Sequence, residues 1–157
     1  MCSRSLELKN DPESESNWHT AERRYNILNK LKEFCVENGV SLALRGEVYG
    51  GSIQGLAHNP HTGGDIDFAV YSVYNIGERK YERCDDPFYS PYLAASLDIP
   101  HVPQLSTETA LTKELIDHYD SETKTIMPEH NKFEGVVIQH AGGSFKIINK
   151  WYDSEKE

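Results

Sequence analysis

How this chain folds is decided by one stretch, Leu44-Arg45-Gly46-Glu47-Val48-Tyr49-Gly50-Gly51-Ser52-Ile53-Gln54-Gly55. Apolar residues alternate with Arg45 and Glu47, which is the two-residue period of a strand with one polar face. The glycines that follow predict a loop whose backbone can approach a ligand closely. Glu47 therefore stands beside a glycine-rich turn. Its carboxylate either forms a solvent-facing ion pair with Arg45 or accepts hydrogen bonds from the hydroxyls of a ligand.

The segments on either side of this strand have periodic patterns of their own. Apolar residues recur at three- and four-residue steps, which predicts one helix over 17–38, capped by Ser16 or Asn17 and ended by Gly39. The other predicted elements are strands over 2–8 and 66–76, an edge after the turn at 77–83, short helices starting at Asp86-Pro87 and over 107–119, and hairpin strands over 133–140 and 144–151. The predicted fold class is α+β, with a largely antiparallel sheet and flanking helices.

Composition limits the classes of protein that fit. A length of 157 residues allows one domain with a real core, and the net charge of −9 argues against a surface that coats nucleic acid indiscriminately. The three cysteines are widely spaced, which favours a reducing compartment over a disulfide framework. We find no signal peptide and no membrane-spanning run, so we expect a cytoplasmic protein with no membrane partner. The histidines show no metal-ligand spacing, and we expect them on the surface.

Tyr71 is a second candidate for ligand binding. In the two-residue period of its strand it shares a face with Ala69 and Val73, while Phe68 and Val70 lie on the other face. One face has to be core, and the other can line a pocket. Tyr71 is then either a core aromatic or a flat platform on which a purine stacks.

Three charged residues stand at strand positions where they could meet phosphates. Glu134 opens an apolar strand, as a plain terminal charge or as an oxygen ligand of a metal such as Mg²⁺. Lys146 is flanked by apolar residues, and its amine either extends to water or points into a phosphate site. Arg4 has the same two interpretations. Each signal is weak alone, but their joint occurrence is not.

Taken in order, these segments resemble motifs of the covalent nucleotidyltransferase superfamily, which comprises RNA ligases, DNA ligases and capping enzymes. The branch they are most similar to is the ATP-dependent RNA ligase family of Deinococcus type. The similar motifs are Cys2-Ser3-Arg4-Ser5-Leu6-Glu7-Leu8 (motif Ia), the Gly-Glu and Gly-Ile-Gln-Gly element within 44–55, in which Ser52 replaces the usual lead glycine, Asp67-Phe68-Ala69-Val70-Tyr71 (motif III), Glu134-Gly135-Val136-Val137-Ile138 (motif IV) and Ser144-Phe145-Lys146 (motif V). The resemblance covers nearly the whole chain and implies a nucleotidyltransferase (ATP-grasp-like ligase) fold.

The resemblance also implies a role for each candidate. Arg4 would contact the phosphate or the RNA end, Glu47 would bind the ribose, and Tyr71 would stack on adenine. Glu134 would hold the metal and Lys146 the α-phosphate, which makes these two the catalytic residues present. The implied cofactors are ATP or AMP with Mg²⁺ or Mn²⁺, and the implied partners are RNA ends, among them those of a nicked duplex. A lysine takes AMP from ATP, AMP passes to an RNA 5′-phosphate, and a 3′-hydroxyl then displaces it.

The chain departs from the family pattern at the lysine that would take up AMP. No Lys-Xaa-Asp-Gly occurs in the sequence, and the nearest run, Lys9-Asn10-Asp11-Pro12, has a proline in place of the glycine and follows Arg4 instead of preceding it. Motif V often has a second lysine where this chain has Ile148, and the aspartate usual after the motif III aromatic is Ser72. The appended RNA-specificity domain of the family is also missing from the sequence.

We therefore expect residues 1–157 to be a partial adenylyltransferase domain of an RNA ligase, without the motif I lysine strand. The isolated chain is predicted not to attach AMP to itself. Two alternatives stay open: a non-catalytic nucleotide- or RNA-binding remnant, and one half of a split ligase whose second polypeptide supplies motif I. We expect Glu47, Tyr71, Glu134 and Lys146 to serve one adenosine phosphate.

Overall fold

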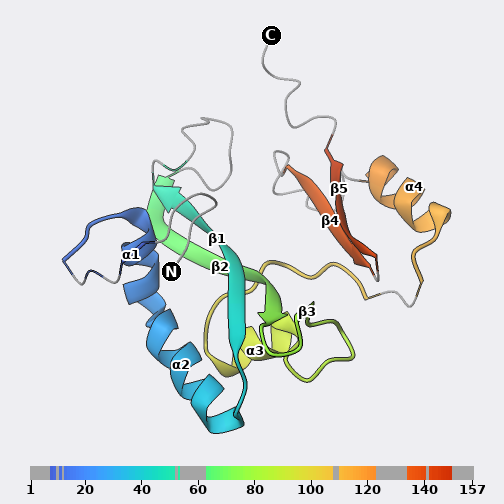
Figure 1. The fold of residues 1–157 in the computed structure, drawn as a ribbon. Coiled ribbons are helices and arrows are strands. Elements are labelled where there is room, and N and C mark those ends of the chain that lie inside the picture. Colours follow the sequence, from blue (N-terminus) through green and yellow to red (C-terminus); the bar gives the residue numbers. More distant parts are fainter. Residues whose placement is uncertain are drawn as a thin grey trace. The chain divides into compact units, whose positions relative to one another are not determined.

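The computed structural model describes residues 8–9, 11, 13–51, 53, 63–107, 110–122, 134–140 and 142–149. The chain divides into two compact units, Met1–Ile53 with Gly63–Leu105 and Gln54–Thr62 with Ser106–Glu157. Each unit has its own antiparallel sheet and its own hydrophobic core (Figure 1). Helices and antiparallel strands in both units confirm the predicted α+β class.

The helix predicted over 17–38 is two helices, α1 (Asn17–Tyr25) and α2 (Ile27–Asn38). Asn26 separates them with φ 52° and ψ 43°, a left-handed conformation that asparagine adopts more readily than most residues. As predicted, Ser16 caps α1 by accepting from the His19 N–H, and Gly39 ends α2 at φ 63°. The single helix was wrong at Asn26 because one left-handed residue barely disturbs the apolar period on either side.

The first unit is built on a three-stranded sheet in the order β1 (Leu42–Gly51), β2 (Gly63–Asn75), β3 (Lys80–Tyr81). Both pairings are antiparallel, and β3 is the edge that the charged turn after β2 predicts. One face of β1 and β2 packs against the helices, with Val70 and Val73 completely buried. The buried apolar residues of this core are Ala21, Leu42, Val48, Phe68, Val70, Val73, Leu93, Ala94, Leu97 and Ile99.

Helix α3 (Ser90–Ser96) begins later than the predicted start at Asp86-Pro87, and the proline in its first turn is Pro91. The Asp86 carboxylate is instead used in the preceding turn. It accepts from the Arg83 N–H at 2.8 Å and pairs with the Lys80 amine at 2.7 Å. These contacts, with the lysine hydrogen bond first, lower the pKa of Asp86. An Asp-Pro dipeptide suits a turn as well as a helix start, and here the turn forms.

His19 is buried and His101 is half-buried, which corrects the prediction that the histidines lie on the surface. His19 is 7% exposed; its Nδ1 lies 2.6 Å from the Ser16 hydroxyl and its Nε2 2.8 Å from the Lys9 carbonyl. His101 is half-buried, with Nδ1 2.6 Å from the Val102 carbonyl and Nε2 3.0 Å from the Ser90 hydroxyl. Since a carbonyl can only accept, the Nδ1 of His101 donates and its Nε2 accepts.

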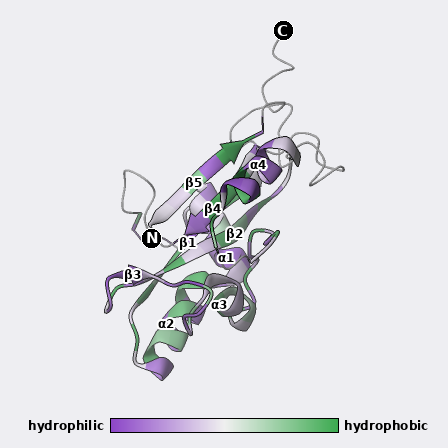
Figure 2. Ribbon diagram, turned by 90° about the vertical axis from the view of Figure 1, so that its right-hand side faces the viewer, coloured by the Kyte–Doolittle hydropathy of each residue, from purple (hydrophilic) through white to green (hydrophobic). Residues whose placement is uncertain are grey.

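The second unit consists of α4 (Lys113–Glu122) and the hairpin of β4 (Gly135–His140) and β5 (Gly143–Ile148). Helix α4 starts later than the helix predicted over 107–119, whereas the predicted hairpin is confirmed. One face of the hairpin packs on α4 through buried Tyr119, Val136 and Ile147. Figure 2 shows why the helix packs on one side only, since green hydrophobic stretches of α4 alternate with purple hydrophilic ones.

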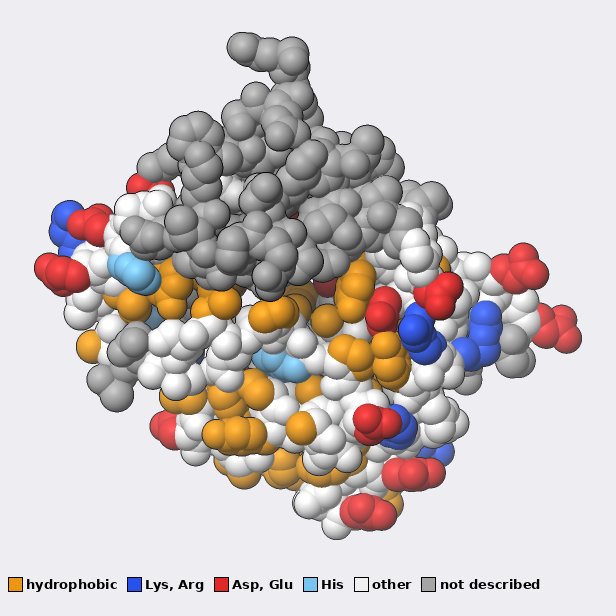
Figure 3. Space-filling view, turned by 180° about the vertical axis from the view of Figure 1, so that it is seen from behind, with side chains coloured by type: hydrophobic (Ala, Val, Ile, Leu, Met, Phe, Trp, Pro, Cys, Tyr) orange, Lys and Arg blue, Asp and Glu red, His pale blue; other side chains and the backbone are white. Residues whose placement is uncertain are grey.

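No helix among the described residues is long and apolar enough to cross a membrane. Charges of both signs are interspersed on the face drawn in Figure 3, where blue Lys and Arg side chains neighbour red Asp and Glu side chains. Ion pairs of the first unit include Lys30–Asp98 at 3.7 Å and Lys80–Glu78 at 3.0 Å. Exposed pairs of this kind contribute little to stability.

Candidate nucleotide-binding site

Glu47 lies on the outward face of β1, as its strand period predicts. It is exposed and stands opposite Ala69 of β2, while its neighbour Val48 is buried in the core. Arg45 shares this face. The Arg45 guanidinium is directed to the tyrosines Tyr71 and Tyr81 and not to Glu47. Of the two interpretations of Glu47, a carboxylate available to a ligand is therefore the one that the geometry favours.

Tyr71 reaches the same face through a bulge in β2. Arg45 pairs with Ser72 and the next residue, Gly46, pairs with Val70, so that Tyr71 is an extra residue in the ladder. A bulge of this kind re-aims a side chain. The Tyr71 ring centroid lies 6.0 Å from the Arg45 guanidinium carbon. Its ring therefore belongs with the outward-facing residues of β1.

The same bulge corrects the predicted partners of Tyr71. Val73 was predicted to share its face, but Val73 is completely buried with Phe68 and Val70. The extra residue reverses the alternation after Val70, which a two-residue period cannot anticipate. Phe68, the other aromatic of motif III, is a core residue at 9% exposure. Of the two rings, only that of Tyr71 lies on the polar face.

Glycine at position 46 is what allows Phe68 to pack where it does. A Cβ atom built there would lie 2.2 Å from Phe68 Cζ and 2.6 Å from the Ala69 carbonyl oxygen. Gly50 plays a comparable part at the end of the strand, where a Cβ would lie 2.1 Å from the Asp65 carbonyl oxygen. Gly50 and Gly51 thus continue β1, which corrects the prediction of a loop at these residues. Gly55 lies outside the described residues.

Asp67 has hydrogen-bond contacts that the sequence analysis did not predict. Its carboxylate accepts from the Tyr25 hydroxyl and, at 2.7 Å, from the Phe68 N–H. Burial, followed by this hydrogen bond, raises the pKa of Tyr25 to about 12. Burial also raises the pKa of Tyr49, with further contributions from the charge of Asp67 and a hydrogen bond to it. Tyr49 lies opposite Asp67 in the strand register, and the sequence alone does not give that register.

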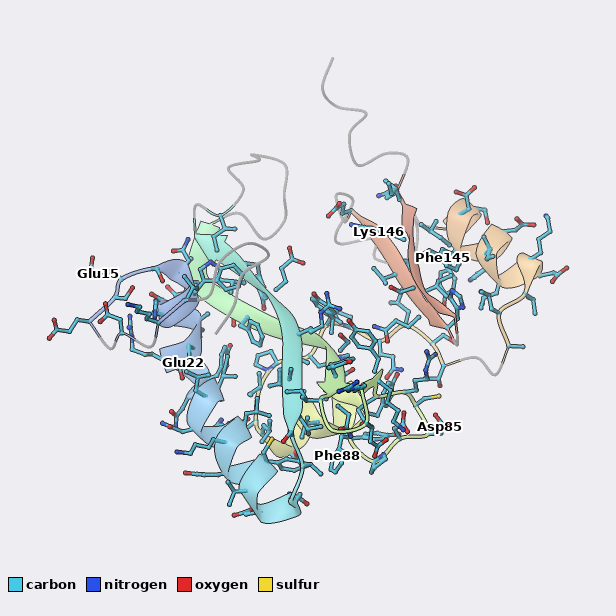
Figure 4. The ribbon with its side chains drawn as sticks, in the orientation of Figure 1. Glu15, Glu22, Asp85, Phe88, Phe145 and Lys146 are labelled. Carbon is cyan, nitrogen blue, oxygen red and sulfur yellow. The ribbon has the colours of Figure 1, made fainter. Side chains whose placement is uncertain are left out.

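In the second unit, Glu134 and Lys146 are brought together. The Lys146 Nζ lies 2.7 Å from Glu134 Oε1, with the side chains 36% and 59% exposed. Lys146 points away from α4, whereas its neighbour Phe145 packs toward the helix (Figure 4). The Glu134 carbonyl accepts from the Asn149 N–H at 2.9 Å, which fixes the strand start opposite the end of β5. The pair is therefore accessible and preformed.

The structure thus places the predicted residues in two sets. Glu47 and Tyr71 lie on one face in the first unit, and Glu134 and Lys146 form an ion pair in the second. Arg4 lies outside the described residues, and so does most of the strand predicted over 2–8.

A divalent metal would have few protein ligands here. No cluster of three or more His, Cys, Asp or Glu side chains suited to a metal occurs in the described part of the chain. Glu134, with its carboxylate largely exposed, can offer an oxygen ligand and leave the other coordination positions to water and phosphate. That is how Mg²⁺ is commonly bound beside nucleotides, so the available donor fits such an ion.

The described residues thus form antiparallel strands that carry an outward carboxylate, an aromatic ring and a lysine–glutamate ion pair. The family model described as RNA ligase matches residues 1–152, and the chain therefore belongs to the RNA ligase family. No curated protein gave a significant match.

Solved structures of the RNA ligase from Naegleria gruberi are similar to this chain. The structure with PPi is 26% identical with a TM-score of 0.70, covering 99% of this chain and 44% of that chain. A mutant with ATP and Mn is 26% identical with a TM-score of 0.67, and another with AMP and Mn is 28% identical with a TM-score of 0.66, each covering 96% of this chain and 43% of that one. The chain spans less than half the length of these ligase chains. Their fold confirms the predicted nucleotidyltransferase architecture.

Proposed function

We propose that this chain is the nucleotide-binding body of an ATP-dependent RNA ligase that seals RNA 3′-hydroxyl and 5′-phosphate ends through AMP intermediates. The observation that carries the proposal is the common outward face of Glu47 and Tyr71, a carboxylate and an aromatic ring brought together by a bulge. Membership of the RNA ligase family supports it, as do similar ligases solved with ATP or AMP and Mn.

On this proposal, the first unit binds the nucleoside. Glu47 accepts hydrogen bonds from the ribose hydroxyls, because its carboxylate is exposed and the Arg45 guanidinium is directed to the tyrosines. The Tyr71 ring stacks on adenine, which every flat aromatic surface can do without hydrogen bonds to the base.

The second unit supplies charge for the phosphates. Lys146 binds the α-phosphate as a compact cation and stabilises the negative charge that develops during transfer. Glu134 holds the lysine in place through their ion pair and is the ligand available to Mg²⁺ or Mn²⁺. The bound metal would supply Lewis-acid stabilisation of the phosphates. Arg4 is assigned to phosphate or RNA-end binding from the family resemblance alone.

We further propose that the chain by itself does not take up AMP covalently. The family uses a lysine in Lys-Xaa-Asp-Gly, which this sequence does not contain. Lys9 is not a substitute. It is exposed, whereas a nucleophilic lysine has to be partly deprotonated by burial or by neighbouring charge.

The test is to incubate the chain with α-labelled ATP and Mn²⁺, then to measure noncovalent binding by equilibrium dialysis and covalent labelling after denaturation. We expect saturable binding, at least tenfold weaker in Lys146→Met, and no labelled band. Lys113→Met is the matched control, because Lys113 is an exposed lysine of the same unit that also pairs with a carboxylate. Absence of binding would overturn the nucleotide site, and a labelled band that survives denaturation would overturn the argument about the missing lysine.

A second candidate function follows from the same absence. The chain can act as a non-catalytic nucleotide- or RNA-binding module, or as one half of a split ligase whose partner polypeptide supplies motif I. Sealing of pre-adenylylated RNA distinguishes these cases, since that step needs no lysine–AMP adduct. Sealing without added ATP supports a ligase, whereas RNA binding without sealing supports the binding module. A neighbouring reading frame that contains Lys-Xaa-Asp-Gly would support the split enzyme.

A further inference from the structure

Arg45 contacts two tyrosine rings on the polar face of the first unit. Its guanidinium carbon lies 6.0 Å from the ring centroid of Tyr71 and 5.4 Å from that of Tyr81, and its Nη1 donates to the Tyr81 hydroxyl. The Tyr81 ring in turn meets Tyr74 edge-on, with centroids 5.0 Å apart and an interplanar angle of 67°. Strands β1, β2 and β3 each contribute to this cluster.

Local geometry explains why the cluster forms. The bulge in β2 turns Tyr71 toward Arg45, and the short β3 pairing places Tyr81 directly opposite Tyr74. Arginine suits the position because its guanidinium is planar, always charged and able to stack on aromatic faces while donating in its own plane. Exposed arginines usually sample many rotamers. Here the Tyr81 hydroxyl and the two rings hold one arrangement.

We propose that Arg45 is a positioning residue for purine recognition, fixing the orientation of the Tyr71 ring against which adenine stacks. This inference rests on the proposed function and adds Arg45 and Tyr81 to it. Arg45 acts through Tyr71 and belongs to the first compact unit, whereas the Lys146 and Glu134 pair assigned to phosphates belongs to the second. Removing the Arg45 guanidinium should therefore weaken the contribution of the adenine base to ATP affinity and leave the contribution of the phosphates unchanged.

The experiment compares two probes, ATP and inorganic pyrophosphate, each titrated into the full chain by calorimetry in the presence of Mn²⁺. In Arg45→Met we expect the Kd for ATP to rise roughly three- to tenfold, the range for losing a cation–aromatic contact and part of a stacking surface. The Kd for pyrophosphate should stay within twofold of the wild-type value. Arg79→Met is the matched control, because Arg79 is an exposed arginine in the turn between β2 and β3, and both constants should be unchanged there.

A second variant keeps the test informative if Arg45→Met folds poorly. Tyr81→Phe keeps the ring and removes only the hydroxyl that accepts from Arg45, so we expect an intermediate rise in the Kd for ATP, about twofold, with pyrophosphate again unaffected. Equal losses for both probes would overturn the inference, because Arg45 would then act on phosphate. Unchanged ATP affinity in both variants would overturn it as well. Failure of the wild-type chain to bind ATP would instead refute the proposed function itself.

Discussion

Replacing Gly46 by alanine should destabilise the first unit, because a Cβ at this position has no room. The new Cβ would meet Phe68 Cζ at 2.2 Å, Phe68 Cε2 at 2.5 Å and the Ala69 carbonyl oxygen at 2.6 Å. Two of these atoms belong to a core ring and one belongs to the backbone of the paired strand. Neither can yield by a simple change of rotamer, so β1 and β2 have to move apart locally.

The size of the effect follows from overpacking. Extra methyl groups in a packed core cost about 1–3 kcal/mol, and the backbone contact places Gly46→Ala near ~3 kcal/mol. For a chain of this length, that loss corresponds to a fall in Tm of about 6–12 °C. Gly77→Ala is the matched control, since its Cβ would meet only Asn75 Oδ1, at 3.5 Å. Its free energy of unfolding should change by less than ~0.5 kcal/mol.

Urea denaturation followed by circular dichroism measures both variants. A double variant with Phe68→Ala adds a second check, because removing the ring removes two of the three close contacts. The two substitutions should then cost less together than the sum of their separate costs, by about 1–2 kcal/mol. If Gly46→Ala unfolds at the wild-type urea concentration, Phe68 does not pack over β1, and the assignment of the polar face to Tyr71 loses its basis.

Three further predictions concern single contacts. Burial and the hydrogen bond to Asp67 raise the pKa of Tyr25 to about 12. The stability that depends on the protonated hydroxyl is therefore complete below about pH 10 and is lost as the pH rises toward about 12. Tyr25→Phe should flatten this part of the curve of stability against pH, measured by urea denaturation. Burial lowers the pKa of His101, so below about pH 6.5 the unfolded chain binds a proton on this imidazole more readily than the folded chain does. Stability should therefore fall with acidification less steeply in His101→Gln than in wild type. Asn26→Gly should leave Tm nearly unchanged, whereas Asn26→Ala should lower stability by about 1 kcal/mol because alanine is strained at φ 52°.

Patterns that depend on local sequence were predictable here. The cap at Ser16, the left-handed end at Gly39 and the strand that carries Glu47 follow from side-chain chemistry and two short periods. The hairpin of β4 and β5 was predictable for the same reason, because two apolar runs flank a glycine turn. The ion pair between Glu134 and Lys146 needed the strand register in addition to the local sequence. Each was singled out alone, and the antiparallel register then brings the residue before β4 close to β5.

Two errors concern the bounds of helices. Asn26 interrupts a helix without interrupting its apolar period, since a single left-handed residue shifts the direction of the chain but leaves apolar residues on both sides able to face the same sheet. Asp86-Pro87 has the composition of a helix start, but its carboxylate is engaged by Lys80 and by the Arg83 N–H. These competing contacts come from β3 and from the turn after it, and helix propensity alone does not describe them.

The bulge at Tyr71 matters most for the proposed function, because it decides on which face of the sheet the Tyr71 ring lies. A regular strand would have aligned Tyr71 with Val73, and one of the two would have been misplaced: either a valine exposed among polar residues or a tyrosine forced into the core. One extra residue resolves the conflict, since Val70 and Val73 both enter the core while Tyr71 turns outward beside Arg45. The energetic reason for the bulge is thus the burial of two valines on either side of it. Its chemical consequence is an aromatic ring on the same face as Glu47, and our proposal of nucleoside binding rests on this arrangement.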